Sequence, residues 1–215
     1  MKTTINNATS GIIVYKLIDA IQENKDYLSE IDGLIGDGDH GVNMNKGFTL
    51  FNEKLKKKEL SLSQALAILS ETLMDDIGGS MGPLYGVFFG DMSAAINDIS
   101  VIDKITFKDM LRDALAAVEE IGGAKRGDKT LLDTIYPAYE AYCSALESNS
   151  DFYNALEALK SGATAGWKST EGMIAKIGRA SRLGERSRGV LDAGATSCHI
   201  ILSSMADSIQ DILKA

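Results

Sequence analysis

Three aspartates, Asp32, Asp37 and Asp39, form a D-x4-D-x-D pattern around the stretch IGDGDHGVNMN. Clustered carboxylates repel one another, and a bound divalent cation relieves that repulsion. Oxygen ligands of this kind suit a hard cation, Mg²⁺ or Ca²⁺. The alternative is a solvated loop in which aspartate and glycine form turns and cap a helix. The EF-hand pattern is not matched, and zinc is disfavoured because His40 is the one softer ligand beside the acids.

The same stretch contains a literal G-x-G-x-x-G, formed by Gly36, Gly38 and Gly41. A dinucleotide-binding turn needs a strand before this pattern and a helix after it. The sequence shows no strand pattern, and Asp37 and Asp39 would repel a pyrophosphate. We therefore reject the dinucleotide interpretation. The P-loop signature is absent as well, because no G-K-[ST] occurs in the chain.

Many of the 21 glycines gather in four loops, IGDGDHG, IGGSMGPLYG, IGGAKRGD and LGERSRGVLDAG. A helix needs one glycine at its C-terminal end, whereas clusters let backbone N–H groups approach a ligand closely. We expect the four loops to form one composite polar site; the alternative is that they are tight turns. Basic residues accompany the loops, and we expect one or two of them to contact phosphate. The seven candidates are Lys125, Arg126, Lys129, Arg179, Arg182, Arg186 and Arg188.

The remaining reactive side chains give weaker signals. His40 precedes a helix and is expected either to bind phosphate or to cap that helix, whereas His199 is expected to be a packed residue of the last helix. Cys143 and Cys198 lie among apolar helical neighbours, which predicts buried free thiols. Nucleophilic catalysis has no recognisable motif here.

Charge and hydropathy exclude several classes of partner. The net charge of −8 disfavours nucleic acid and anionic membranes. No apolar run approaches the ~18 residues of a membrane span, and the polar start lacks a secretory signal. We expect a cytoplasmic protein. An anionic small ligand would need local positive charge or a bridging cation.

Apolar residues recur at spacings of three and four along the chain, which predicts amphipathic helices and an all-α fold. Eight such faces lie at 14–21, 44–55, 62–77, 84–99, 107–118, 132–146, 152–163 and 195–212. Ser61 with Gln64 and Thr106 with Asp109 are read as helix caps, and Pro83 suits a first helical turn. Pro137 implies that the sixth helix kinks or starts later. We predict one domain, 1–215, of about eight helices.

Four motifs in order carry a family resemblance: GDGDHGVNMNKGF, GGSMGPLYG, GGAKRGDKTLLD and GRASRLGERSRGVLDAGATS. Together they resemble the nucleotide-binding L subunit of dihydroxyacetone (glycerone) kinases. The resemblance implies eight antiparallel helices closed into a barrel, with ADP or ATP on the loops at one end. It implies that Asp32, Asp37 and Asp39 hold two Mg²⁺ ions and act catalytically through the metal, together with Arg179. The implied nucleotide contacts are His40, Gly41, Val42, Asn43, Ser80, Met81, Gly122, Leu131, Arg179, Asp192, Ala193 and Gly194.

The resemblance also implies an activity that needs partners. The L subunit would pass a phosphoryl group to dihydroxyacetone held on a separate K subunit. In one branch a phosphotransferase-system M subunit rephosphorylates bound ADP, and in the other ATP is exchanged; a chain of this length fits the first branch better. The alternatives are an ATP-dependent kinase subunit for another triose or tetrose, and a regulatory module that binds a transcription activator.

Overall fold

The computed structural model describes residues 1–55 and 59–215 of the chain, and within them it contains nine α-helices. The helices are α1 (Ile12–Glu23), α2 (Lys25–Ile35), α3 (His40–Leu55), α4 (Leu62–Asp76), α5 (Met81–Ala94), α6 (Lys104–Gly122), α7 (Leu132–Glu147), α8 (Phe152–Ser169) and α9 (Ala193–Lys214). Three 3₁₀ segments, η1 (Asn7–Thr9), η2 (Thr170–Gly172) and η3 (Arg179–Ser187), join them. Strands β1 (Ile5–Asn6) and β2 (Val101–Ile102) pair antiparallel.

The all-α prediction is confirmed, and each of the eight apolar faces lies on a helix. Three details differ. The helix α2 was not among the predicted helices, although Leu28, Ile31 and Ile35 give it a buried face. The fourth face was expected to reach 99, but α5 ends at Ala94 because Asn7 Nδ2 donates to the carbonyls that follow, Ile96 O and Ile99 O, at 2.8 Å each. The second face was expected to include Leu55, but the side chain of Leu55 is not among those that the structure describes.

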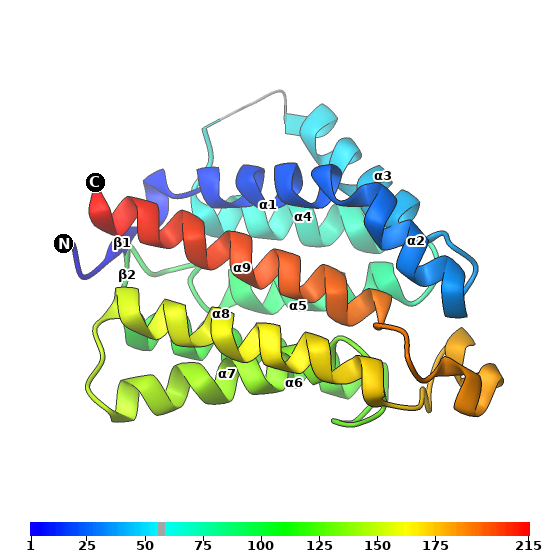
Figure 1. Cartoon of the computed structure of the whole chain (residues 1–215). Helices are drawn as coiled ribbons and strands as arrows, with labels where there is room; N and C mark the ends of the chain where they lie inside the picture. The colour runs from blue at the N-terminus through cyan, green and yellow to red at the C-terminus, as the bar shows by residue number, and fades with distance from the viewer. Residues whose placement is uncertain (56–58) are drawn as a thin grey trace.

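Eight of the helices close into a ring (Figure 1). Going around it, α1 packs on α3, and α3, α4, α5, α6, α7, α8 and α9 follow in chain order until α9 packs back on α1. The helix α2 lies outside this sequence, at one end, against α3, α9 and η3. The eight-helix barrel implied by the resemblance is therefore confirmed, with α2 as an addition.

The ring places all four glycine-rich loops at one end. Neighbouring helices alternate in direction, so every second connection emerges at the same end of the barrel. These connections are the segments 36–39, 77–80, 123–131 and 170–192, and they are the predicted glycine loops. Both chain termini lie at the opposite end (Figure 1), where Lys2 N donates to Leu213 O at 2.8 Å.

Large apolar side chains fill the interior of the ring. Phe48, Phe51, Phe88 and Phe89 are 0% exposed. Full burial of a side chain of this size contributes about 1.5–3 kcal/mol, so the core stabilises the barrel and holds the loops in place. Of the two free thiols, Cys198 is buried as expected and Cys143 is half-buried. No helix in the described residues has the length and hydropathy that crossing a bilayer would require.

One predicted helix cap is confirmed and one is wrong. Ser61 Oγ accepts from Gln64 N at 3.1 Å, while Gln64 Oε1 accepts from Ser61 N, as a capping box requires. At α6 the cap is Asp103, not Thr106, because the helix starts three residues earlier than the apolar pattern suggested. Asp103 Oδ1 accepts from Thr106 N at 2.8 Å and from Ile105 N at 2.9 Å, which lowers the pKa of Asp103.

Pro137 lies inside α7, which begins at Leu132, so the late-start interpretation is wrong; the kink stays a prediction. Pro83 is the third residue of α5, within the first turn as expected. The surface of α7 around Pro137 receives two glycines of α8. A Cβ at Gly162 would collide with Pro137 O, and a Cβ at Gly166 would collide with Asp133 O. The two helices approach closely because α8 lacks side chains at these positions.

We expect Gly162→Ala to lower the free energy of unfolding by about 1–3 kcal/mol, because the added methyl group forces α8 away from α7. Gly172→Ala is the matched control, since no atom lies within 4 Å of a Cβ placed there. Urea denaturation of both variants measures the difference. Equal stability of the two variants would contradict the packing argument.

Candidate functional site

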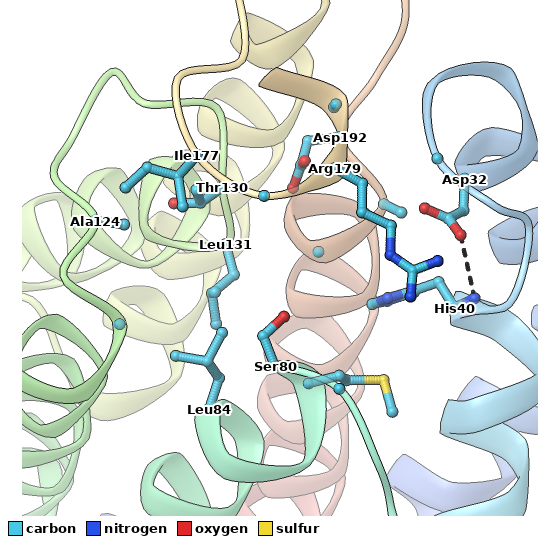
Figure 2. Close-up of a pocket in the computed structure, with 18 of the residues that line it drawn as sticks. Asp32, His40, Ser80, Leu84, Ala124, Thr130, Leu131, Ile177, Arg179 and Asp192 are labelled. Atoms are coloured by element: carbon cyan, nitrogen blue, oxygen red, sulfur yellow. Dashed lines mark hydrogen bonds between the residues drawn. The ribbon is translucent and has the colours of Figure 1, made fainter. Parts of the chain in front are cut away.

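The glycine loops surround one cavity of about 660 Å³ at the end of the barrel (Figure 2). Thirteen of the residues predicted from the sequence line it: Asp32, Asp37, Asp39, His40, Asn43, Ser80, Met81, Gly122, Leu131, Arg179, Asp192, Ala193 and Gly194. They come from four separate connections and the helix ends beside them, up to 162 residues apart in the sequence (Asp32 to Gly194). The structure thus brings the four motifs together in one place.

Two predicted contacts, Gly41 and Val42, do not line the cavity. Gly41 faces α2, where a Cβ would collide with the carbonyl oxygen of Lys25. Val42 is 51% exposed on the outer surface of α3. Both follow His40 on a helix, and the helical turn of about 100° per residue directs them to other faces. Gly41 therefore allows α2 and α3 to pack closely.

The acidic end of the cavity is made by the three predicted aspartates. Asp32 lies in the last turn of α2, and Asp37 and Asp39 follow in the loop before α3. One carboxylate oxygen from each lies within 4.8 Å of the other two. Gly38, with φ of +75°, turns the chain there, and His40 N donates to Asp32 Oδ2 at 3.3 Å. Three hard oxygen donors at this spacing fit a Mg²⁺ or Ca²⁺ ion.

Arg179 supplies positive charge at this end. Its guanidinium contacts Asp37 Oδ2, and it projects toward the space beside His40 (Figure 2). Of the seven basic candidates, Lys129 and Arg179 line the cavity. The Lys129 side chain is buried, and its ammonium donates to backbone carbonyls. Arg126 pairs instead with Glu140 at 2.6 Å, outside the cavity.

His40 is held by two hydroxyl groups. Its Nε2 lies 2.9 Å from Ser197 Oγ, which lies 2.6 Å from the hydroxyl oxygen of Tyr85. Both hydroxyls also reach Gly194 O, at 3.1 and 3.2 Å. Burial lowers the pKa of His40 to about 4, against the opposing effect of Asp32, so the imidazole is neutral at pH 7. His199, by contrast, lies on α9 and stacks on Trp167 of α8, as expected of a packed residue.

Four helices begin at the cavity: α3, α5, α7 and α9. The first N–H groups of a helix are unpaired, and the helix dipole makes this end attractive to anions. At α9, Asp192 accepts from Ala195 N at 2.7 Å as the N-cap. Burial raises the pKa of Asp192 to about 7, while the Ala195 N–H and the Lys129 charge act in the opposite direction.

The other end of the cavity is apolar. Leu84 and Leu131 lie together on the side away from Asp32 and His40, with Ala124 and Ile177 above them (Figure 2). Ile121 also lines this end and is 51% exposed. An exposed isoleucine on a cavity wall offers contact area to a flat apolar group. The cavity therefore combines a charged end with an apolar end.

Comparison with known proteins identifies the family. A family model described as the DAK2 domain matches residues 34–207. The chain belongs to the DAK2 domain family. It is 33% identical, over 96% of each chain, to "PEP-dependent dihydroxyacetone kinase 2, ADP-binding subunit DhaL" of Listeria innocua. It is 38% identical to the ADP-binding subunit DhaL of the PEP-dependent dihydroxyacetone kinase of Escherichia coli, over 87% of this chain and 90% of that one.

A solved structure shares the fold of this DAK2 domain. The dihydroxyacetone kinase from C. freundii, in complex with AMP-PNP and Mg²⁺, aligns with a TM-score of 0.68 at 22% identity. The alignment covers 97% of this chain and 35% of that one. The family membership predicted from the four motifs is confirmed.

Several residues in and around the cavity of the DAK2 domain were not predicted from the sequence. Ser197 contacts His40, Tyr85 contacts Ser197, and Leu84, Ala124 and Ile177 form the apolar end. Tyr85 and Leu84 belong to the GGSMGPLYG motif, and Ser197 ends the last motif, so their positions were available. Their roles were not, because apolar and hydroxyl residues in a helix are ordinarily core residues.

We expect Ser197→Ala to lower the free energy of unfolding by about 1–3 kcal/mol, because it leaves His40 Nε2 and the Tyr85 hydroxyl without their shared partner. Ser203→Ala, on the same helix, is the control. Its hydroxyl lies 3.4 Å from His199 Nδ1 and its residue is half-buried. Thermal and urea unfolding measure both. Comparable losses in the two variants would argue against the hydroxyl chain.

Proposed function

We propose that this chain is the ADP-binding subunit of a PEP-dependent dihydroxyacetone kinase. It holds an adenine nucleotide across the cavity and passes a phosphoryl group to dihydroxyacetone. The observation that carries the proposal is the division of one cavity into an acidic, N-terminus-lined end and an apolar end. The two relatives matched over most of their length, both named as ADP-binding subunits, support it.

The charged end receives the phosphates. Asp32, Asp37 and Asp39 hold Mg²⁺, two ions by resemblance to the family, and bound Mg²⁺ supplies the positive charge that neutralises the nucleotide phosphates. Arg179 adds a mobile cation, 61% exposed, that leaves Asp37 for a phosphate oxygen when metal occupies the carboxylates. The N–H groups at the starts of α5 and α9, near Ser80 and Gly194, approach the same phosphates.

The apolar end receives the adenine. Leu84 and Leu131 provide one wall, and Ile121 and Ile177 another. Asp32 of the metal cluster lies on the opposite side in Figure 2, so a neutral ring is accepted at the apolar end, where a phosphate is not favoured. His40 lies at the charged end, beside Asp32, as a neutral imidazole, which binds a phosphate or ribose oxygen without repelling the metal.

Transfer requires partners. We propose that a phosphotransferase-system M subunit rephosphorylates the bound ADP and that a separate K subunit presents dihydroxyacetone, in the cytoplasm. The exposed carboxylates and Arg179 at the mouth allow a second protein to reach the terminal phosphate. The chain's role in the reaction is to position that phosphate and balance its charge.

Two alternatives give different results in one assay. An ATP-dependent kinase subunit for another triose or tetrose would turn over free ATP without phosphoenolpyruvate. A regulatory module would bind a transcription activator in the ADP state without transferring phosphate. Purified chain supplied with K and M subunits, phosphoenolpyruvate and dihydroxyacetone is expected to form dihydroxyacetone phosphate, with ADP needed only in amounts matching the protein. Turnover that needs excess ATP would overturn the cofactor role of ADP.

Asp37→Asn is expected to change ADP binding in opposite directions with and without metal. With Mg²⁺ the affinity falls by at least about tenfold, because a metal ligand is lost. In EDTA it is unchanged or stronger, because a repelling charge is removed. Calorimetric titration with ADP measures both conditions, and Asp26→Asn, whose side chain is fully exposed on α2, is the control. A loss of affinity in EDTA as well would show that Asp37 acts without metal.

Leu84→Ala is expected to weaken ADP binding by about tenfold, because it removes apolar contact with the base. Binding of pyrophosphate with Mg²⁺ should stay within about twofold, because pyrophosphate has no base to contact Leu84. Equilibrium titration of each ligand gives the comparison. Equal losses for the two ligands would place the base elsewhere.

A further inference from the structure

Lys129 is a buried lysine whose ammonium is not available to a ligand. Its side chain is 1% exposed although the residue lines the cavity. Nζ donates to Ser187 O and Val190 O at 2.5 Å each and to Met173 O at 3.3 Å. An ammonium has three N–H donors, and three backbone carbonyls occupy them.

The three carbonyls belong to a single stretch of chain, 173–192, which connects η2 to α9. Met173 begins this 173–192 segment, Ser187 ends η3, and Val190 lies two residues before Asp192. The segment carries Arg179, which contacts Asp37, and it ends at the N-cap of α9. Lys129 thus joins the loop before α7 to three points along the segment that carries Arg179, the exposed cation of the cavity.

The loop that carries Lys129 is itself rigidly held. Asp133, 2% exposed, accepts from Gly127 N at 2.5 Å and from Thr130 N at 2.8 Å. Lys129 has a φ of +64°, a conformation that a non-glycine residue adopts at a cost. This backbone conformation is held by its neighbours and directs the side chain under the 173–192 segment.

The surroundings explain why a charge is present there. A buried ammonium is tolerated only when its donors are all paired, and here they are. Glu171 and Asp192 lie close enough to favour the charged form, while burial and Arg188 lower the pKa of Lys129. A neutral side chain would leave carbonyls of an irregular segment without their donor.

We propose that Lys129 is a positioning residue that fixes the 173–192 segment, so that Arg179 reaches the phosphate end of the cavity. This role rests on the proposed function, because Arg179 is taken to meet the nucleotide phosphates. Lys129 itself touches no phosphate, since its donors are used by the backbone.

The test combines Lys129→Met with Arg179→Ala in the complete K, L and M system. Lys129→Met is expected to lower kcat at saturating nucleotide by between about tenfold and about a hundredfold, because Arg179 is displaced. In the Arg179→Ala background the same change should alter kcat by less than about twofold, because the residue through which Lys129 acts is gone. Losses that multiply in the double variant would overturn the proposal.

Hydrogen exchange gives a readout that needs no nucleotide. Amides of the 173–192 segment should exchange faster in Lys129→Met while those of α8 keep their rates. Equally faster exchange of the 173–192 segment and α8, or no change in the rates of either, would refute the positioning role. Lys129→Arg keeps the charge and replaces Lys129→Met in this experiment if Lys129→Met does not fold. The planar guanidinium cannot bind the same three carbonyls, so the 173–192 segment should exchange at intermediate rates.

Lys160→Met is the matched control. Lys160 also donates to three oxygens, Glu157 Oε1, Asp207 Oδ1 and Gln210 Oε1, but none of these residues lines the cavity. It should leave kcat and the exchange of the 173–192 segment unchanged. If the wild-type chain binds no ADP, the proposed function fails; if it binds ADP and Lys129→Met behaves as wild type, the positioning role alone fails.

Discussion

The closed ring of eight helices is the constraint on which the site depends. Because neighbouring helices alternate in direction, closing the ring brings four helix starts and the four connections that precede them to one end. The starts of α3, α5, α7 and α9 direct the positive ends of their dipoles at the cavity, and the connections bring glycines. An anion site follows from this topology before any side chain is considered. The core aromatics keep the ring closed, so they hold the loops indirectly.

The side chains then add negative charge to a place that attracts it. Asp32, Asp37 and Asp39 lie beside α3, where the helix dipole favours carboxylates. Three such charges would oppose a phosphate, unless a divalent cation intervenes. In the proposed function, metal and nucleotide therefore bind poorly alone and well together. A chain with a net charge of −8 then binds a nucleotide because the metal supplies positive charge where the phosphates lie.

The sequence predicted the helices well where burial is one-sided. The apolar face that contains Leu62, Leu66 and Leu69 has a clear helical period. The spacing of Ser61 and Gln64 identified Ser61 as an N-cap. It missed α2, in which Leu28, Ile31 and Ile35 give only a short apolar face. Gly41 and Val42 were assigned to the site by the family resemblance, but helix geometry directs them to other faces. The hydroxyl chain could not be predicted, because Ser197 and His40 lie 157 residues apart.

Lys129 shows that the basic residues near a glycine loop in the sequence do not all contact the ligand in the fold. Seven basic residues accompany the glycine loops, and the sequence offers no way to rank them. Burial separates Lys129 from the rest, since its charge is directed into the protein, while Arg179 remains 61% exposed at the cavity. The two residues have complementary roles. The buried Lys129 stabilises the irregular 173–192 segment, and the exposed Arg179 is able to move with a phosphate. The long 173–192 segment has few buried apolar residues to hold it in place. It therefore needs the buried charge of Lys129 in order to keep Arg179 in one position.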